Sequence, residues 1–508
     1  MSQHKNILLV FTDQMRFDAI EAYGNPVIKT PVLNGLIDEG VSFNRAYTPC
    51  PVCVPARYSM HTGLMPHQTG VFENTTMPDN HRSFMEILAD HGYQNFGVGK
   101  MHFAFETGFS TKWGFTDRQV CDEDEDLEKN DFYQNNKANG YGHVYDYKGV
   151  RSEMYYVPQV SQLPADLHHS SWTVNCSIDY LENRDKDKPF FMMTSFEKPH
   201  PPFEPPVPWN KLYRGPDMPL PKRPEGAESL LTLWNKFQNR YKYRDQGTDD
   251  NLIKQMKAHY YAEVSYLDYN LGRLFDYMES KQLLDNTLVV FTADHGEFLG
   301  DYNCFGKRSF LDSAARIPMI VKHPEFSGQS TCDTPVSLVD LMPTFLSYAG
   351  IDYKEPLDGV DLLALAEGLN QRAMIYGQYE QGDYANYMAT DGCFKYIYSA
   401  PDQKEILLDL KSDPEETRNK ALNPLYYEKV KEMRQKTIDY FMAEGYDTPF
   451  ENGRWKVHPV KEMPDDPDAY LLFQDPAGSI PKIPGYTTDT NQKKHFNFLW
   501  YDQLYGKV

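Results

Sequence analysis

Short apolar runs in the N-terminal part of the chain predict buried strands. They lie at residues 6–11, 189–196 and 287–292, and residues 94–98 are a further predicted short strand with polar positions. Runs with few polar positions are typical of strands that are buried on both faces of a parallel sheet. From residue 253 to 278, apolar side chains recur every three to four positions, which predicts a long amphipathic helix. This alternation of strands and helices predicts an α/β fold around a mostly parallel sheet.

The pattern changes at about residue 375, where shorter runs separated by turns predict an antiparallel sheet. Its strands are predicted at 387–390, 394–398 and 405–410, followed by a helix at about 424–443. Residues from about 450 to 508 have scattered aromatic side chains that follow neither a helical nor a strand periodicity. We expect this segment to wrap around its own domain and a neighbouring subunit. The predicted division is a catalytic domain at 1–375 with insertions at about 104–165 and 204–250, an antiparallel-sheet subdomain at 376–449 and an extended tail at 450–508.

Polar side chains follow each predicted parallel strand directly. Asp13 and Gln14 follow the strand predicted at 6–11, and Lys100 and His102 follow the one at 94–98. His200 follows the strand at 189–196, and Asp294 and His295 follow the one at 287–292. Ligands bind beyond the carboxyl ends of the strands in open α/β sheets, so these side chains are expected to share one site. Lys100 and His102, two positions apart on an extended segment, would face the same side. Taken alone, each has a structural alternative, such as a turn cap for Asp13.

A further candidate is Cys53, which lies between a proline-containing bend and a predicted helix. Pro55 suits the first turn of a helix, because its missing N–H would be unpaired there anyway. The free N–H groups and the dipole of a helix start favour an anion. Arg57, one turn on, would point its guanidinium toward the same place. A sulfur nucleophile beside an oxyanion site is the functional interpretation, and a structural cysteine is the alternative.

Composition narrows the function classes. The formal net charge is −21 and the isoelectric point about 5.2, which argues against nucleic acid or an anionic membrane surface as partner. The seven cysteines are odd in number and scattered, so they do not form a disulfide framework. Cys50 and Cys53 have no second pair at zinc-finger spacing. The N-terminus shows no signal-peptide pattern, and we therefore expect a cytoplasmic protein.

Residues 53–57, Cys-Val-Pro-Ala-Arg, with Thr-Gly at 62–63, resemble the sulfatase signature. In this family of the alkaline phosphatase superfamily, the cysteine is oxidised after translation to formylglycine, whose hydrate is the nucleophile. Other family elements follow in the same order between residues 5 and 445. The pair Asp13-Gln14, where many sulfatases have two aspartates, is similar to the choline sulfatase and phosphonate monoester hydrolase branch. The resemblance implies an alkaline-phosphatase-like α/β/α sandwich with a smaller C-terminal α+β subdomain.

The resemblance implies one divalent cation. Its ligands would be Asp13, Gln14, the modified Cys53, Asp294 and His295. Hard oxygen donors favour Ca²⁺, while Mn²⁺ or Mg²⁺ would also fit a set that includes an imidazole.

The resemblance also assigns catalytic roles. Arg57, Lys100 and Lys307 would offset the negative charge of the transferred group, and Lys100, His200 and Lys307 would bind the substrate. His200 would protonate the leaving alcohol. His102 would assist the release of the ester from the nucleophile.

Other polar residues are assigned less directly. Asn74 matches a substrate-binding position of the choline-sulfatase-like pattern, with a turn asparagine as the equal alternative. Arg308 is expected to be a surface charge. His168 and His169 fall in a helix predicted at 166–181 and are also expected at the surface.

Three hypotheses follow for the function. The first is hydrolysis of a small-molecule or saccharide sulfate ester, and the second is hydrolysis of phosphonate monoesters or phosphodiesters on the same scaffold. The third is a catalytically silent anion-binding protein with an unmodified Cys53. The sequence favours the first. The resemblance implies a formylglycine-generating enzyme as maturation partner, and we expect a homo-oligomer, dimer or tetramer, as the assembly.

Overall fold

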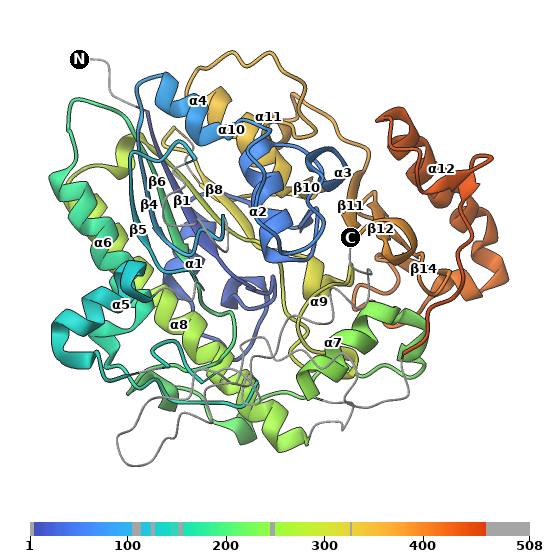
Figure 1. Cartoon of the computed structure of the whole chain (residues 1–508), viewed down its shortest axis with the longest axis horizontal. Helices are drawn as coiled ribbons and strands as arrows, with labels where there is room; N and C mark the ends of the chain where they lie inside the picture. Colours follow the sequence, from blue (N-terminus) through green and yellow to red (C-terminus); the bar gives the residue numbers. More distant parts are fainter. Residues whose placement is uncertain are drawn as a thin grey trace.

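The computed structural model describes residues 5–103, 113–122, 127–144, 146–150, 156–243, 249–325 and 328–463 of the 508-residue chain. Its central feature is an eight-stranded sheet with the spatial order β5–β4–β6–β1–β7–β8–β2–β9 (Figure 1). The strands are β1 Asn6–Thr12, β2 Val41–Phe43, β4 Gln94–Gly99, β5 Asp117–Val120, β6 Phe190–Phe196, β7 Thr287–Ala293, β8 Met319–Lys322 and β9 Ser330–Cys332.

The register of the central strands brings their carboxyl ends together. Strand β1 lies between β6 and β7 and is parallel to both, so that Thr12 pairs with Phe196 on one side and with Ala293 on the other. Strand β4 is parallel to β6 and ends one residue earlier at the same edge, where Gly99 pairs with Ser195. Strand β8 runs antiparallel to β7. The prediction of a mostly parallel sheet is confirmed, and the four strands predicted at 6–11, 94–98, 189–196 and 287–292 are neighbours in it.

Helices cover both faces of the sheet. Phe96 of β4 stacks on Tyr180 of α6, whereas Phe191 of β6 contacts Phe84 of α4 at the opposite face. Helices α1, α6 and α8 lie on one face, and α2, α4 and α10 on the other (Figure 1). They are α1 Pro31–Asp38, α2 Cys53–Thr62, α4 Phe84–Asp90, α6 His169–Asn183, α8 Asp250–Ser280 and α10 Leu341–Tyr348. The α/β/α sandwich is thus confirmed.

The long helix α8 has the packing that its apolar period predicts. Every residue of the predicted stripe, from Ile253 to Met278, is buried, and the helix packs against α1 and α6. The side chain of Asp249 caps its first turn by accepting hydrogen bonds from the N–H groups of Asn251 and Leu252. The stripe is therefore core packing.

A second, antiparallel sheet of four strands lies beside the main sheet, in the order β11–β12–β13–β14 (Figure 1). Its elements are β11 Ile375–Tyr379, β12 Asn386–Thr390, β13 Phe394–Ser399, β14 Lys404–Asp409 and helix α12 Tyr427–Ala443, which packs on it. The stacking of Tyr376 on Tyr440, with ring centroids 3.7 Å apart, joins helix and sheet. The three predicted strands and the helix are confirmed, and β11 is an additional strand.

Short elements complete the described part of the chain. They are β3 Ala46–Tyr47 paired with β10 Val336–Ser337, the hairpin β15 Phe450–Glu451 and β16 Arg454–Trp455, and helices α3 Pro66–Thr69, α5 Asp131–Asn136, α7 Leu233–Tyr243, α9 Asp312–Ala315 and α11 Leu362–Ala366. The first predicted insertion contributes β5 to the edge of the main sheet, an element that the sequence pattern did not predict.

The structure leaves the predicted tail and the predicted domain division untested. The predicted tail from residue 464 onward lies outside the described residues, so its wrapping role stays a prediction, as does the division into domains. Among the described helices, none combines the length and apolar character needed to cross a membrane.

Candidate active site

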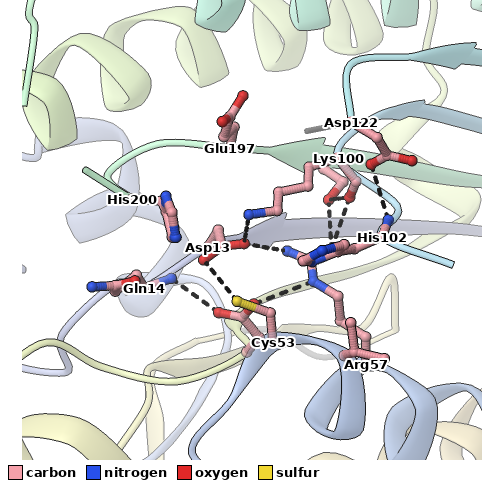
Figure 2. Close-up of polar contacts among 12 residues, drawn as sticks. Asp13, Gln14, Cys53, Arg57, Lys100, His102, Asp122, Glu197 and His200 are labelled. Carbon is pink, nitrogen blue, oxygen red and sulfur yellow. Dashed lines mark hydrogen bonds and ion pairs between the residues drawn. The ribbon is translucent and has the colours of Figure 1, made fainter. Parts of the chain in front are cut away.

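The polar residues predicted at the strand ends do converge on one place. Figure 2 shows the side chains of Asp13 and Lys100 pointing toward Cys53 and Arg57, which come from α2. The residues after β1, β4, β6 and β7 thus meet the start of α2 above the carboxyl edge of the sheet, as the topology requires.

Helix α2 is built to present its first turn. It begins at Cys53, and Gly63 ends it with a positive φ of 67°, where its N–H bonds the carbonyl of Ser59. The side-chain oxygen of Asn74 accepts the N–H of Val54 at 3.0 Å, which satisfies one of the free donors of the helix start. All ten residues of α2 are buried. Asn74 therefore supports the helix that carries Cys53, and its predicted contact with substrate remains a proposal.

Four metal-capable side chains form one buried group. The ligand atoms of Asp13, Cys53, Asp294 and His295 all lie within 4.8 Å of one another. The sulfur of Cys53 is 3.8 Å from Oδ1 of Asp13 and 3.3 Å from Nε2 of His295. Two carboxylates and an imidazole that face a common point are a donor set that fits a divalent cation.

Arg57 orients the two carboxylates of this group. It is fully buried, with Nη2 3.1 Å from Oδ2 of Asp13 and Nε 3.2 Å from Oδ2 of Asp294. Lys100 Nζ adds a contact of 2.8 Å to the same oxygen of Asp13. Because these cations occupy the Oδ2 atoms, the Oδ1 atoms face Cys53 and His295. The structure shows the Arg57 guanidinium bound to both aspartates, and its predicted action on a substrate oxyanion stays a prediction.

Burial and charge set the protonation of the group. Burial by itself raises a carboxyl pKa, but the charges of Lys100, His200 and Arg57 hold the pKa of Asp13 well below its usual range. Burial, with the nearby charge of Asp13, raises the pKa of Asp294. Burial and the positive charge of Lys307 hold the pKa of His295 well below its usual range.

A neutral imidazole is the form that ligates a metal, so His295 is held in the right state for that role. Burial, with the nearby charge of Asp13, also raises the pKa of the Cys53 thiol to about 12. The unmodified thiol is therefore protonated at neutral pH and is a weak nucleophile.

Lys307 and Gln14 border the same metal-capable group. Lys307 Nζ lies 2.8 Å from Cys53 Sγ and 3.1 Å from Nε2 of His295. Its third contact is the side-chain oxygen of Gln14, at 3.3 Å. The main-chain N–H of Gln14 donates to Oδ1 of Asp294 at 2.9 Å. Both residues therefore lie beside the metal-capable group, and their predicted roles as cation ligand and substrate-binding lysine stay predictions.

The two predicted histidines lie in the loops that follow β6 and β4. His200 follows β6, and its Nδ1 lies 2.9 Å from the carbonyl oxygen of Pro201. The backbone N–H of His102 donates to Oδ1 of Asp122 at 2.9 Å (Figure 2). His102 has a positive φ of 58°, so the expectation that Lys100 and His102 lie on one extended segment is wrong. The chain turns at this point because Asp122 also binds the N–H of Met101.

Sequence reasoning missed a second set of buried polar residues. Glu297 is fully buried and contacts Gln14 and the hydroxyl of Tyr156, which comes from the first insertion. The signal available was its place in the run from Asp294 to Glu297, directly after a buried strand. Its partners could not be read from that run, because they lie far away in sequence.

Three expected surface residues are not at the surface. Arg308 is mostly buried, and its Nε and Nη2 donate hydrogen bonds of 3.0 Å each to the two carboxylate oxygens of the buried Glu73. His168 and His169 are each 1% exposed, and Nε2 of His168 lies 3.1 Å from Oε1 of Glu204. These predictions were wrong because a charged or polar side chain is buried only with a partner that the fold supplies.

The sequence profile of the sulfatase family matches residues 5–351, which include every predicted site residue. The chain belongs to the sulfatase family. A second profile, described as the C-terminal region of N-sulphoglucosamine sulphohydrolase, matches residues 300–442 of the sulfatase. It is thus a hydrolase that acts on sulfate esters.

Known proteins resemble this sulfatase over most of its length. The arylsulfatase of Clostridium perfringens is 28% identical over 473 residues, covering 87% of this chain and 95% of the relative. The choline-sulfatase of Rhizobium meliloti is 28% identical over 449 residues, covering 82% and 83%. The crystal structure of the phosphonate monoester hydrolase of Agrobacterium radiobacter superimposes with a TM-score of 0.74 at 22% identity, covering 87% of this chain and 96% of the other. This last likeness confirms the fold.

Proposed function

We propose that Cys53 is converted to formylglycine and that the enzyme uses it, with one divalent cation, to hydrolyse the sulfate monoester of a small alcohol or a saccharide. The observation that supports this most strongly is the surroundings of Cys53 Sγ. Lys307 Nζ at 2.8 Å and His295 Nε2 at 3.3 Å lie beside it within the buried metal-capable group. A nucleophile position, cation ligands and a fixed positive charge thus meet at one point.

The cation would be held by Asp13, Gln14, Asp294 and His295, together with the side chain at position 53. This donor set fits because two carboxylate oxygens and one neutral imidazole face a common point, and the amide oxygen of Gln14 lies at its edge. Hard oxygen donors favour Ca²⁺, and the imidazole also suits Mn²⁺ or Mg²⁺.

In the proposed mechanism, a hydrated formylglycine supplies a hydroxyl nucleophile, and the cation supplies positive charge that lowers the pKa of that hydroxyl. Lys307 and Lys100 hold the oxygens of the transferred group and offset their charge. Arg57 keeps the Oδ1 atoms of the two aspartates turned toward the site. The overall reaction consumes one water and gives sulfate and the free alcohol.

The two histidines complete the proton transfers in this proposal. His200 donates a proton to the leaving oxygen, because its ring is held beside Pro201 at the end of β6. His102 accepts a proton at position 53, which returns the site to its starting state. Asn74 binds an oxygen of the substrate through its amide nitrogen, while its oxygen stays on the start of α2.

The alternative function is hydrolysis of phosphonate monoesters or phosphodiesters on the same scaffold. The observation in its favour is Gln14, a neutral residue beside the metal-capable group where a second aspartate is common in sulfatases. Both kinds of substrate present a tetrahedral oxyanion to the same positive groups, so the residues around Cys53 suit either.

Initial rates on an aryl sulfate and an aryl phosphonate monoester distinguish the two functions. We expect the sulfate to be preferred by about tenfold or more in kcat/KM, and Cys53→Ala to lower both rates by about a thousandfold. Cys50→Ala is the matched control, because Cys50 is also buried and its thiol donates to the carbonyl of Phe72 at 3.7 Å rather than to a residue of the metal-capable group. A tenfold preference for the phosphonate would instead support the alternative.

Three further expectations belong to this proposal. A formylglycine-generating enzyme modifies Cys53 during maturation. The protein forms a dimer or tetramer with the help of its tail, and it works in the cytoplasm. Size-exclusion chromatography with light scattering on the full chain and on a chain that ends at residue 463 tests the second expectation.

A further inference from the structure

The carboxylate of Glu297 is surrounded by hydrogen-bond donors. Its Oε1 accepts the N–H of Leu299 at 2.8 Å and the N–H of Gly306 at 2.6 Å. Its Oε2 accepts the hydroxyl of Tyr156 at 2.7 Å and the side-chain NH₂ of Gln14. The residue is fully buried. A carboxylate accepts about four hydrogen bonds, so this one is saturated by groups of the protein.

The other end of the Gln14 amide faces the proposed cation. Its oxygen lies 3.3 Å from Lys307 Nζ, which itself contacts Cys53. The backbone of Gln14 is held on both sides: its N–H donates to Asp294, and its carbonyl accepts the hydroxyl of Tyr260 at 3.0 Å. These two bonds fix the main chain of Gln14 beside the site, and the contacts of its side chain then decide which end of the amide faces the metal-capable group.

A side-chain amide has one donating and one accepting end, and the two ends have nearly the same shape. An ionised carboxylate only accepts hydrogen bonds, and the four donors around Glu297 favour that form, so it binds the NH₂ end of Gln14. The oxygen end is then turned toward Lys307 and the metal-capable group. The same carboxylate also binds the N–H of Gly306, the residue before Lys307. One acidic group therefore fixes both a cation ligand and the loop of the lysine that borders it.

We propose that Glu297 is a positioning residue that turns the oxygen of Gln14 toward the cation and makes glutamine, rather than an acidic residue, the fitting side chain at position 14. The inference rests on the proposed function, because it assumes the cation site. An acidic side chain at position 14 would leave Oε2 of Glu297 without the Gln14 donor and would place two carboxylates in contact. Residues that orient metal ligands in this way typically contribute tenfold to a hundredfold in metal affinity.

The exchange of the two side chains tests the proposal. Gln14→Glu and Glu297→Gln each keep the size of the side chain but destroy the match of donor and acceptor. In the double variant, the amide at position 297 accepts the N–H groups of Leu299 and Gly306 through its oxygen. Its NH₂ group donates to the new carboxylate at position 14, so the match is restored with the direction reversed.

The measurement is the affinity of the purified full-length protein for Ca²⁺ and for Mn²⁺, by isothermal titration calorimetry after chelator treatment. Each single variant is expected to bind about tenfold or more weakly than the wild type, and the double variant to recover most of the loss. Asp268→Asn is the matched control. Asp268 is a buried carboxylate that accepts backbone N–H groups of Val32 and Leu33 away from the site, and its replacement is expected to leave the affinity unchanged.

The outcomes separate a failure of the role proposed for Glu297 from a failure of the cation site. Wild-type affinity in Glu297→Gln overturns the proposal, and so does a double variant that binds no better than the single ones. A wild type that binds neither cation overturns the proposed cation site itself, which is a different failure. Thermal unfolding in chelator checks the fold of each variant. If Glu297→Gln does not fold, the double variant must fold and bind for the proposal to stand.

Discussion

The ammonium nitrogen of Lys307 lies 2.8 Å from the sulfur of Cys53. Lys307 comes from the loop after β7, whereas Cys53 begins α2, so the contact joins two segments that lie 254 positions apart. The lysine is 5% exposed and also borders His295 and Gln14. A fixed positive charge at this place is suited to the oxygens of a group that is transferred to position 53.

Replacement of Lys307 by methionine is expected to lower kcat of the mature enzyme by about a hundredfold to a thousandfold, because a preorganised charge in a buried site is lost. Steady-state kinetics on an aryl sulfate measure the effect. Lys322→Met is the control, since Lys322 pairs with Glu39 away from the site and is expected to keep full activity. Equal activity of Lys307→Met and wild type would remove Lys307 from the mechanism.

Arg57 is expected to hold the metal-free site together. Arg57→Met leaves Asp13 and Asp294 without the cation that binds both, and should lower the free energy of unfolding by about 3 to 5 kcal/mol in chelator. Urea denaturation measures the change. The exposed pair of Arg82 and Asp90 provides the comparison, and Arg82→Met should cost less than about 1 kcal/mol. Similar losses in the two variants would contradict this role.

Arg308 is expected to matter for stability although it looks like a surface residue in the sequence. Two of its nitrogens donate hydrogen bonds to the carboxylate of Glu73, and the hydroxyl of Tyr379 in the C-terminal sheet donates to the same carboxylate at 2.8 Å. Arg308→Gln leaves Glu73 as an uncompensated buried charge and should cost about 3 kcal/mol or more. The second substitution Glu73→Gln should recover part of the loss in the same urea titration. A loss below about 1 kcal/mol would be typical of an exposed pair and would contradict the buried geometry.

A pH effect is expected from Asp268 on α8. Burial raises its pKa to about 7, although it accepts the N–H groups of Val32 and Leu33. The folded state therefore binds more protons than the unfolded state between about pH 4 and pH 7. Stability must then fall as pH rises through this range and level off above it.

The Asp268→Asn variant lacks the pH-dependent stability that protonation of Asp268 gives the folded state. Relative to the wild type, the variant should gain stability as pH rises from 4 to 7, by a few kcal/mol in total. Urea midpoints of both proteins between pH 4 and 8 measure the difference. A constant difference across that range would show that Asp268 has the same pKa in the folded and unfolded states.

Much of the site could be predicted because it is encoded locally. Asp13 and Asp294 each follow an apolar run that can only be a buried strand, and the topology of a parallel sheet brings such positions together. Cys53 and Arg57 lie one helical turn apart, so their common direction also follows from a short segment. The main sheet, the long helix α8 and the C-terminal sheet were predicted for the same reason.

What could not be predicted depends on contacts between distant segments. Glu297 and Gln14 lie 283 positions apart, and Arg308 and Glu73 lie 235 apart. A sequence shows that a residue is charged but not which partner the fold brings to it. Strand β5 was missed for a related reason, since it has four residues with few apolar positions and is a strand only because it pairs with β4.

The most direct test of the account is the mass of the proteolytic fragment that carries Cys53, from active protein produced in its native host. The account predicts an aldehyde in place of the thiol at position 53, in a fraction of molecules that rises in proportion to sulfatase activity across preparations. An intact thiol in fully active protein would contradict it, because the nucleophile would then have to be another group.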